Sequence, residues 1–217
     1  MSKSKVFSGS VKFVLIAFFC VTVFLPIFMM FSKIKWDTVS SFVFTQQFAK
    51  TVQNSLSVTI ISTVISVLLA YILAFAINRS RIPCKGAISV LLALPMLIPS
   101  ISHGMGLINI FGENGIFTKL FGINIGLTGF TGIVLGSILY SFPIAFLMLS
   151  DAMKYADATM YESAKVLGIP TANTFFAVTM QYMKRPLISA TFAVFTMIFT
   201  DYGVPLAVGG RFTTLPV

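Results

Sequence analysis

The sequence predicts an all-α polytopic membrane protein, with five transmembrane helices and a helix pair in one cytoplasmic loop. Composition is the first reason, because 57% of the 217 residues are hydrophobic, only 10% are charged, and the mean hydropathy is +0.95. Soluble domains carry roughly 25% charged residues, so this chain has too few to cover a water-facing surface. A soluble enzyme, a nucleic-acid-binding module and a disordered tail all fit this composition poorly. At about 20 residues per span, the length admits five or six helices and no additional large soluble domain.

Five apolar segments are the second reason, because each is long enough to cross the hydrocarbon core as a helix. The first is preceded by Lys3, Lys5 and Lys12 and lacks a small-residue cleavage site after it, so we interpret it as an uncleaved anchor helix. The five segments cover residues 11–31, 56–77, 87–111, 127–149 and 187–208.

The basic residues predict the orientation of these helices. In a soluble protein a net charge of +9 would suggest nucleic acid or another acidic partner, but here the basic residues stand at the ends of apolar segments, where they set topology. The side richer in Lys and Arg faces the cytoplasm, which places the N-terminus inside. The richer side holds Lys3, Lys5, Lys12, Arg79, Arg81, Lys85, Lys154, Lys165, Lys184 and Arg185, and the other side holds Lys33, Lys35, Lys50, Lys119 and Arg211.

The loop of residues 151–186, called the 151–186 loop below, begins with a helical pattern. Met160, Ala164 and Leu167 fall at positions i, i+4 and i+7, which predicts one apolar face of a helix. Gly168 suits the left-handed residue that ends a helix.

A second helix is predicted after that turn. Pro170 suits its first turn, since no backbone donor is needed there, and Pro186 marks the entry to the fifth span. Such a helix pair is a natural attachment point for a partner protein, although a pair at the lipid interface or a packed loop would give the same pattern. The second apolar stripe consists of Phe175, Val178 and Tyr182.

This loop resembles the EAA loop of ABC importer permeases. That motif reads Glu-Ala-Ala, three residues, Gly, and then, nine residues later, Ile-x-Leu-Pro. In this sequence Glu162, Ala164 and Gly168 match, Ser163 replaces the first Ala, Val178 stands for Ile, Met180 for Leu and Gln181 for Pro, and Lys184-Arg185-Pro186 resembles the Arg-Pro that often follows.

The resemblance extends over most of the chain. It points to the branch that contains importers of iron(III), polyamines, thiamine and aminoethylphosphonate, and within it most closely to the iron and phosphonate members. The segments that carry it are residues 94–99, 106–107, 111–115, 141–143, 201–205 and 209–210.

The resemblance implies the permease subunit of an ATP-driven importer in the bacterial inner membrane, with iron(III), a phosphonate or a polyamine as the solute. The expected partners are a cytoplasmic ABC ATPase dimer, a second permease subunit of the same or a homologous sequence, an extracytoplasmic solute-binding protein and lipid, but not nucleic acid. The chain has no G-x-x-x-x-G-K-[ST] motif, so we expect no cofactor in it and no enzymatic activity of its own. ATP and Mg²⁺ would be bound by the partner ATPase.

Such permeases usually end with a further span on the cytoplasmic side. We therefore expect residues 1–217 to form a single permease domain that is truncated at its C-terminus before a sixth helix.

The residues expected to couple the permease to the ATPase lie in the 151–186 loop. The resemblance implies that this loop seats in a cleft of the ATPase and moves as a rigid body. Glu162 would supply a charge contact or a helix cap, and Ala164 and Gly168 would serve by being small. The complete coupling set is Glu162, Ser163, Ala164, Gly168 and Pro170.

A translocation path is expected where prolines interrupt the spans, because broken backbone hydrogen bonds are tolerated beside protein or a water cavity. The path set is Pro95, Pro99, Pro143 and Asp201. Asp201 either contacts a cationic or metal-bearing solute or holds a helix by a hydrogen bond, since a carboxylate within a span is expensive. We expect no catalytic residue and no metal site, and with a single histidine, His103, a structural role is favoured.

The main alternative is an ion-coupled secondary transporter or channel subunit. Such proteins need intramembrane charges to bind the coupling ion, and Asp201 is the one strong candidate here. They would also have no need of the helix pair in the 151–186 loop. An intramembrane enzyme fits less well, because neither HExxH nor GxSxG occurs in the sequence.

Overall fold

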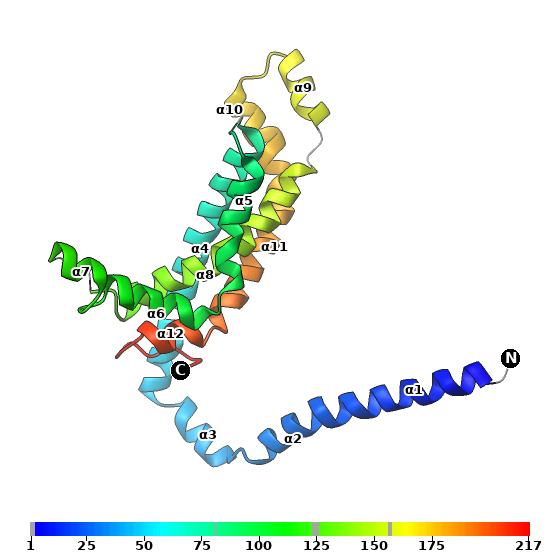
Figure 1. Cartoon of the computed structure of the whole chain (residues 1–217), viewed down its shortest axis with the longest axis vertical. Helices are drawn as coiled ribbons and strands as arrows, with labels where there is room; N and C mark the ends of the chain where they lie inside the picture. The colour runs from blue at the N-terminus through cyan, green and yellow to red at the C-terminus, as the bar shows by residue number, and fades with distance from the viewer. Residues whose placement is uncertain (1–2, 81, 123–125, 156–157) are drawn as a thin grey trace. The chain divides into compact units, whose positions relative to one another are not determined.

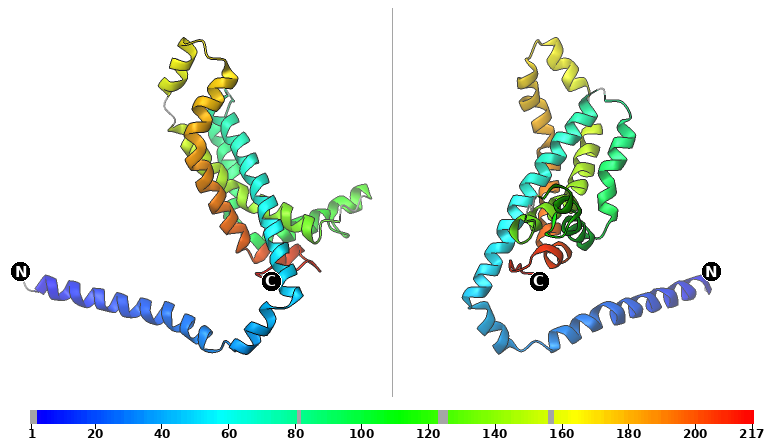
Figure 2. Two further views of the ribbon diagram at one scale, coloured as in Figure 1. Left: turned by 180° about the vertical axis from the view of Figure 1, so that it is seen from behind. Right: turned by 60° about the vertical axis from the view of Figure 1, so that its left-hand side comes forward.

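The computed structural model describes residues 3–80, 82–122, 126–155 and 158–217, and within these residues it contains helices and no strand. The chain divides into two compact units, Met1–Ala49 and Lys50–Val217. Figures 1 and 2 show the order of the helices along the chain.

The first unit is a long helical rod followed by a short helix. From Val11 onward the described side chains of the rod are almost all exposed, as expected for an apolar helix that requires lipid or another protein around it. Its elements are α1 (Lys3–Phe19), the π-helical turn η1 (Cys20–Phe24), α2 (Leu25–Ser32) and α3 (Trp36–Val43).

The second unit is a bundle in which three long helices carry most of the core. Its elements are α4 (Gln46–Arg79, which begins before the unit boundary), α5 (Lys85–Ala93), the 3₁₀ turn η2 (Leu94–Leu97), α6 (Ser100–Phe111), α7 (Ile116–Phe121), α8 (Phe130–Lys154), α9 (Ala158–Val166), α10 (Thr171–Thr174), the π-helical turn η3 (Phe175–Thr179), α11 (Met180–Phe199) and α12 (Gly203–Val208). α9 and α10 lie at one end of the bundle, called the loop end below, and α6, α7 and α12 gather at the opposite end (Figures 1 and 2).

The prediction of a multi-pass helical membrane protein is confirmed. Within the part of the chain that the structure describes, three helices are long and apolar enough to cross a membrane, namely residues 11–32, 46–79 and 130–154. A fourth span is possible if the pair Lys85–Leu97 and Ser100–Phe121, which bends by 99°, crosses as one unit.

The fifth predicted segment, residues 187–208, is not one straight helix. α11 ends at Phe199 and α12 begins only at Gly203, so the apolar run is interrupted where Asp201 stands. Pro186, which was predicted to mark the entry to the fifth span, lies inside α11, because α10, η3 and α11 follow one another without a gap. Lys184 and Arg185 take up part of α11, which leaves a short apolar stretch before the helix ends.

The core of the bundle lies between α4, α8 and α11. Phe146 and Leu149 of α8 are fully buried there, against Ala70 and Ala74 of α4 and Val194 of α11. Alanines on α4 face large side chains on α8, so the helices approach closely and the large side chains fill the space between them.

A second core at the opposite end joins α12 to α6 and α8 through glycines. A Cβ atom on Gly104 of α6 would lie 2.6 Å from the Cβ of Ala207, and one on Gly136 of α8 would lie 2.6 Å from Cγ1 of Val204. Both distances are below van der Waals contact, so only glycine allows α12 to pack this closely. Gly132 of α8 serves the same packing as Gly136, because both glycines face α12 residues.

Gly104→Ala should destabilise the protein, whereas Gly106→Ala should not. The two glycines belong to the same helix, but a Cβ on Gly106 meets nothing within 4 Å. Overpacking at Gly104 should cost about 1–3 kcal/mol, which a lower unfolding temperature in detergent would reveal. Equal unfolding temperatures for the two variants would contradict the close packing of α6 on α12.

Candidate functional site

The 151–186 loop folds as a helix, a sharp turn and a second helix. α9 ends at Val166, and Gly168 has a φ of +67°, the left-handed conformation predicted for it. The backbone N–H of Gly168 donates to the carbonyl of Lys165, and that of Ile169 donates to the carbonyl of Ala164. This pair of hydrogen bonds is a Schellman motif, which satisfies carbonyls that the helix end would leave free.

The predicted apolar face of α9 is only partly correct. Ala164 is buried, with 4% of its surface exposed, but Leu167 is 74% exposed. Leu167 follows the last turn of α9 and precedes Gly168, so its side chain no longer follows the helical period. Glu162 and Ser163 are exposed, and Pro170 is exposed immediately before α10.

A hollow of about 470 Å³ lies between α9 and the helix that follows it. Its lining is mostly apolar, and Ala164 and Ile169, the two residues joined by the Schellman hydrogen bond, both contribute to it. The other lining residues are Thr159, Ser163, Leu167, Val178, Gln181 and Tyr182.

Tyr161 connects α9 to two other helices. The guanidinium carbon of Arg79, the last residue of α4, lies 3.9 Å from the centre of the Tyr161 ring. The Tyr161 hydroxyl shares a hydrogen bond of 2.9 Å with the Thr179 hydroxyl of η3. Sequence reasoning missed Tyr161, since a tyrosine beside the motif carries no signal of its own until its partners are known.

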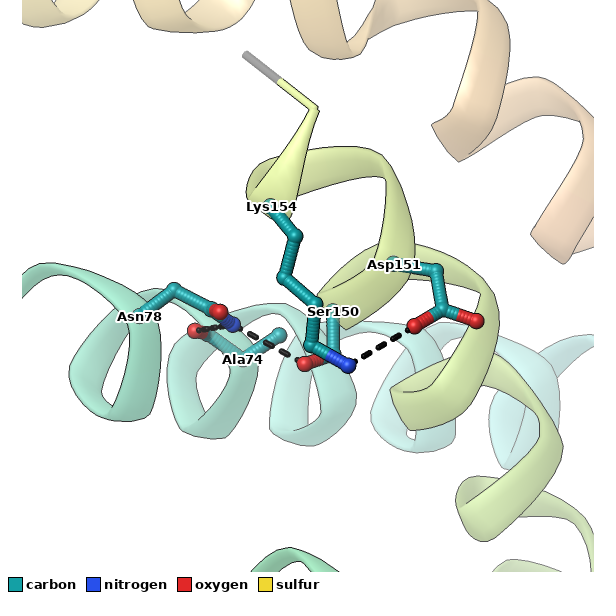
Figure 3. Close-up of polar contacts among 5 residues, drawn as sticks. All are labelled: Ala74, Asn78, Ser150, Asp151 and Lys154. Atoms are coloured by element: carbon teal, nitrogen blue, oxygen red, sulfur yellow. Dashed lines mark hydrogen bonds and ion pairs between the residues drawn. The ribbon is translucent and has the colours of Figure 1, made fainter. Parts of the chain in front are cut away.

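The ends of α4 and α8 are tied together close to this point (Figure 3). Asn78 Nδ2 donates to the carbonyl of Ala74 at 2.8 Å and to Ser150 Oγ at 2.9 Å. One turn further, Lys154 Nζ donates to Asp151 Oδ1 at 2.9 Å, an exposed ion pair within α8 that contributes little to stability. The Asn78 contact therefore fixes the α4 end against α8 at the loop end.

Asp201 caps α12. Its carboxylate accepts hydrogen bonds from the backbone N–H groups of Gly203 (3.3 Å) and Val204 (3.0 Å), while only 8% of the residue is exposed. Of the two roles expected for Asp201, this geometry favours holding a helix, because both oxygens already accept backbone hydrogen bonds.

A small cavity of about 10 Å³ adjoins Asp201. It has room for about one water molecule. Thr214 Oγ1 is buried beside it without a hydrogen-bond partner, and the hydroxyl residues Ser55, Thr59 and Ser137 also line it.

The prolines of the expected path lie in two settings, two of them at a break between helices and one inside an unbroken helix. Pro95 lies in η2, and Pro99 precedes α6, so together they produce the 99° bend. Pro143 is buried inside α8, which remains one helix through it. His103 lies near this bend, where its Nδ1 is 3.3 Å from the carbonyl oxygen of Pro99, a local contact that suits the structural role expected for it.

A stripe of small polar side chains on α4, which sequence reasoning also missed, faces α8. Ser66 and Ser141 share a hydrogen bond of 2.9 Å, and Ser62 Oγ donates to the carbonyl of Val134 at 3.5 Å. Serines and threonines often join helices in membranes this way. The sequence does contain a pattern that could have predicted this stripe, because small polar residues recur there every three or four positions. They are Ser55, Thr59, Ser62 and Ser66.

Together the fold and this site define a multi-pass helical membrane protein with a structured helix–turn–helix loop at one end of its bundle. Residues 66–217 match the family described as the inner membrane component of binding-protein-dependent transport systems, and the chain belongs to that family. The predicted family resemblance is thereby confirmed.

Several relatives carry transport names. A Haemophilus influenzae protein named as ferric transport system permease FbpB 1 is 26% identical over 99% of this chain and 37% of its own length. The molybdenum transport system permease ModB of Azotobacter vinelandii is 27% identical over 74% of this chain and 72% of its own length. A spermidine/putrescine permease PotC homologue of Mycoplasma genitalium is 27% identical over 77% of this chain and 57% of its own length.

The chain spans little more than a third of the length of the Haemophilus relative. It covers 22% of a second ferric permease, FbpB of Actinobacillus pleuropneumoniae.

Replacing Asp201 tests its role as a cap. Asp201→Ala leaves two buried N–H groups without their acceptor and should cost about 1 kcal/mol, whereas Asp201→Asn retains an acceptor oxygen and should cost less. Unfolding temperatures in detergent measure both effects. A protein that loses uptake in Asp201→Asn while keeping its wild-type unfolding temperature would show instead that the negative charge itself is required.

Proposed function

We propose that this chain is a permease subunit of an ATP-driven ABC importer and forms part of the solute path across the cytoplasmic membrane. One observation carries the proposal. This chain belongs to a transport family, and at one end of its bundle it has a helix–turn–helix that is closed by a Schellman motif at Gly168. A closed turn makes the two helices move together, as force transmission from a partner requires.

The coupling surface consists of the exposed residues of α9 and the turn. Glu162 and Ser163 point to solvent and are free to meet an ATPase, while Ala164 faces inward and fixes the helix to the bundle side. Gly168 and Pro170 set the angle at which the second helix begins. Closure of the ATPase would displace this surface and tilt α8 and α11, which flank it in the chain.

ATP and Mg²⁺ belong to the partner ATPase in this proposal. The sequence lacks a phosphate-binding loop, so the chain contributes movement rather than hydrolysis. The remaining partners are a second permease subunit and an extracytoplasmic solute-binding protein, and the family's description as binding-protein-dependent supports the latter.

The solute belongs to a group that includes iron(III) and polyamines. Relatives are named for ferric iron, molybdenum, spermidine/putrescine and thiamine, and the ferric permeases include the relative that aligns with 99% of this chain. Iron(III) is therefore the first solute to test, and a phosphonate, suggested by residues 201–205, is the next.

We place the N-terminus and the loop end in the cytoplasm. Arg79, Lys154 and Lys165 belong to elements that meet at the loop end, whereas Lys119 and Arg211 belong to the opposite end. The positive-inside rule then puts the 151–186 loop on the side where an ATPase is available. A reporter fused after Lys154 that is active only outside the cell would reverse this orientation.

Co-purification tests the proposed function. The tagged chain, extracted in mild detergent from cells that express its neighbouring genes, should retain an ATPase subunit, and the recovered complex should hydrolyse ATP. A preparation that transports solute in response to an ion gradient but retains no ATPase would indicate the secondary transporter instead.

Gly168 offers a matched pair of variants. Gly168→Val should lose the ATPase, because a branched side chain in the left-handed region costs about 1–2 kcal/mol and reopens the turn. Gly168→Asn should retain it, since asparagine tolerates this conformation and no atom lies within 4 Å of the added Cβ. Retention of ATPase by both variants at the same level would remove the turn from the coupling mechanism.

A further inference from the structure

The contacts of Tyr161 give α9 an attachment at the α4 end. The side chains of Glu162, Ser163 and Lys165 are exposed, and Ala164 offers only a methyl group. Tyr161 is half-buried, and its ring and its hydroxyl each meet a different helix.

The contact with Arg79 is electrostatic and directional. A guanidinium above a tyrosine face is attracted by the ring's negative quadrupole, and at 3.9 Å it lies well within the range of this interaction. Arg79 ends α4, where a positive charge also suits the helix dipole. The Tyr161 ring therefore holds the end of a 34-residue helix that runs through the bundle.

The contact with Thr179 joins Tyr161 to η3, on the second helical segment of the loop. Thr179 is buried and belongs to η3, a π-helical turn of the kind often found at functional sites. Four residues earlier in the same turn, Phe175 packs against Tyr71 and Phe75 of α4, with ring centres 6.4 and 5.7 Å apart. Because η3 continues directly into α11, Tyr161 touches the starting point of that helix as well.

From these contacts we propose that Tyr161 is a positioning residue that makes α9 move as one body with the end of α4 and the start of α11. The contacts of Tyr161 with Arg79 and Thr179 are called the joint below. This inference rests on the proposed function, since a displacement of the coupling surface would reach the bundle through the joint. Without the joint, α9 would follow the ATPase while α4 stayed in place.

The experiment measures the distance between α9 and α4 directly. Spin labels on Val166→Cys and Ile72→Cys, both exposed positions, are introduced after Cys20 and Cys84 are replaced by serine. The chain is purified with its ATPase, and the distance is recorded without nucleotide and after trapping with ATP and vanadate. With Tyr161 present, the distance should be the same in both states.

Three variants separate a joint from a general structural role. Tyr161→Leu should keep the ATPase bound yet show a shifted and broadened distance after trapping, and Tyr161→Phe, which keeps the ring over Arg79, should show a smaller shift. Tyr155→Leu is the matched control, because Tyr155 is 83% exposed, and it should behave as wild type.

A double-mutant cycle tests the hydroxyl contact separately. Tyr161→Phe and Thr179→Val remove the two ends of the same hydrogen bond, so the double variant should shift no further than either single variant. Additive shifts would show that the two residues act independently and would overturn this part of the joint.

The two proposals fail in different ways. A distance that changes on trapping even with Tyr161 present, or one that stays fixed in Tyr161→Leu, overturns the joint while leaving the permease function intact. An unlabelled wild-type chain that retains no ATPase under any condition overturns the proposed function, and the joint with it.

Discussion

Backbone hydrogen bonding in lipid is the constraint on which the rest of this structure depends. A peptide group facing hydrocarbon without a partner costs several kcal/mol, so a chain that crosses a membrane must be helical wherever it meets lipid. α4 and α8 obey this rule over 34 and 25 residues. The interruptions at Pro95–Pro99 and at Asp201 are tolerated because the short helices that follow them, α6 and α12, pack against each other and against α8.

The same constraint explains why small residues occupy the contacts that matter most. Lipid tails are as apolar as leucine, so burying large apolar side chains gives helices little reason to associate in a membrane. Association then depends on close approach and on hydrogen bonds between side chains. Glycines allow α12 to approach its neighbours closely, and the pair of Ser66 and Ser141 forms a hydrogen bond between α4 and α8.

The sequence predicted those parts of the fold that are determined locally. Apolar length predicted the segments 11–31, 56–77 and 127–149, which correspond to the helices of residues 11–32, 46–79 and 130–154. The positive φ of Gly168 followed from its place after a helical pattern. The break at Asp201 could not be predicted in the same way, because residues 200–202 lie inside an apolar run and the cap forms only when the backbone turns. Tyr161 was missed for a related reason, because its partners are distant in the chain. Arg79 lies 82 residues earlier and Thr179 lies 18 residues later.

A loop that transmits force must satisfy two opposing requirements. Its outer surface has to remain exposed and polar enough to meet another protein, while its inner surface must be bound tightly enough that displacement is not absorbed as local bending. α9 divides these tasks between neighbouring residues: Glu162 and Ser163 face solvent, and Tyr161 and Ala164 face the bundle. One helix of nine residues meets both requirements because helical geometry turns adjacent side chains about 100° apart, so that a four-residue segment presents one face to each side.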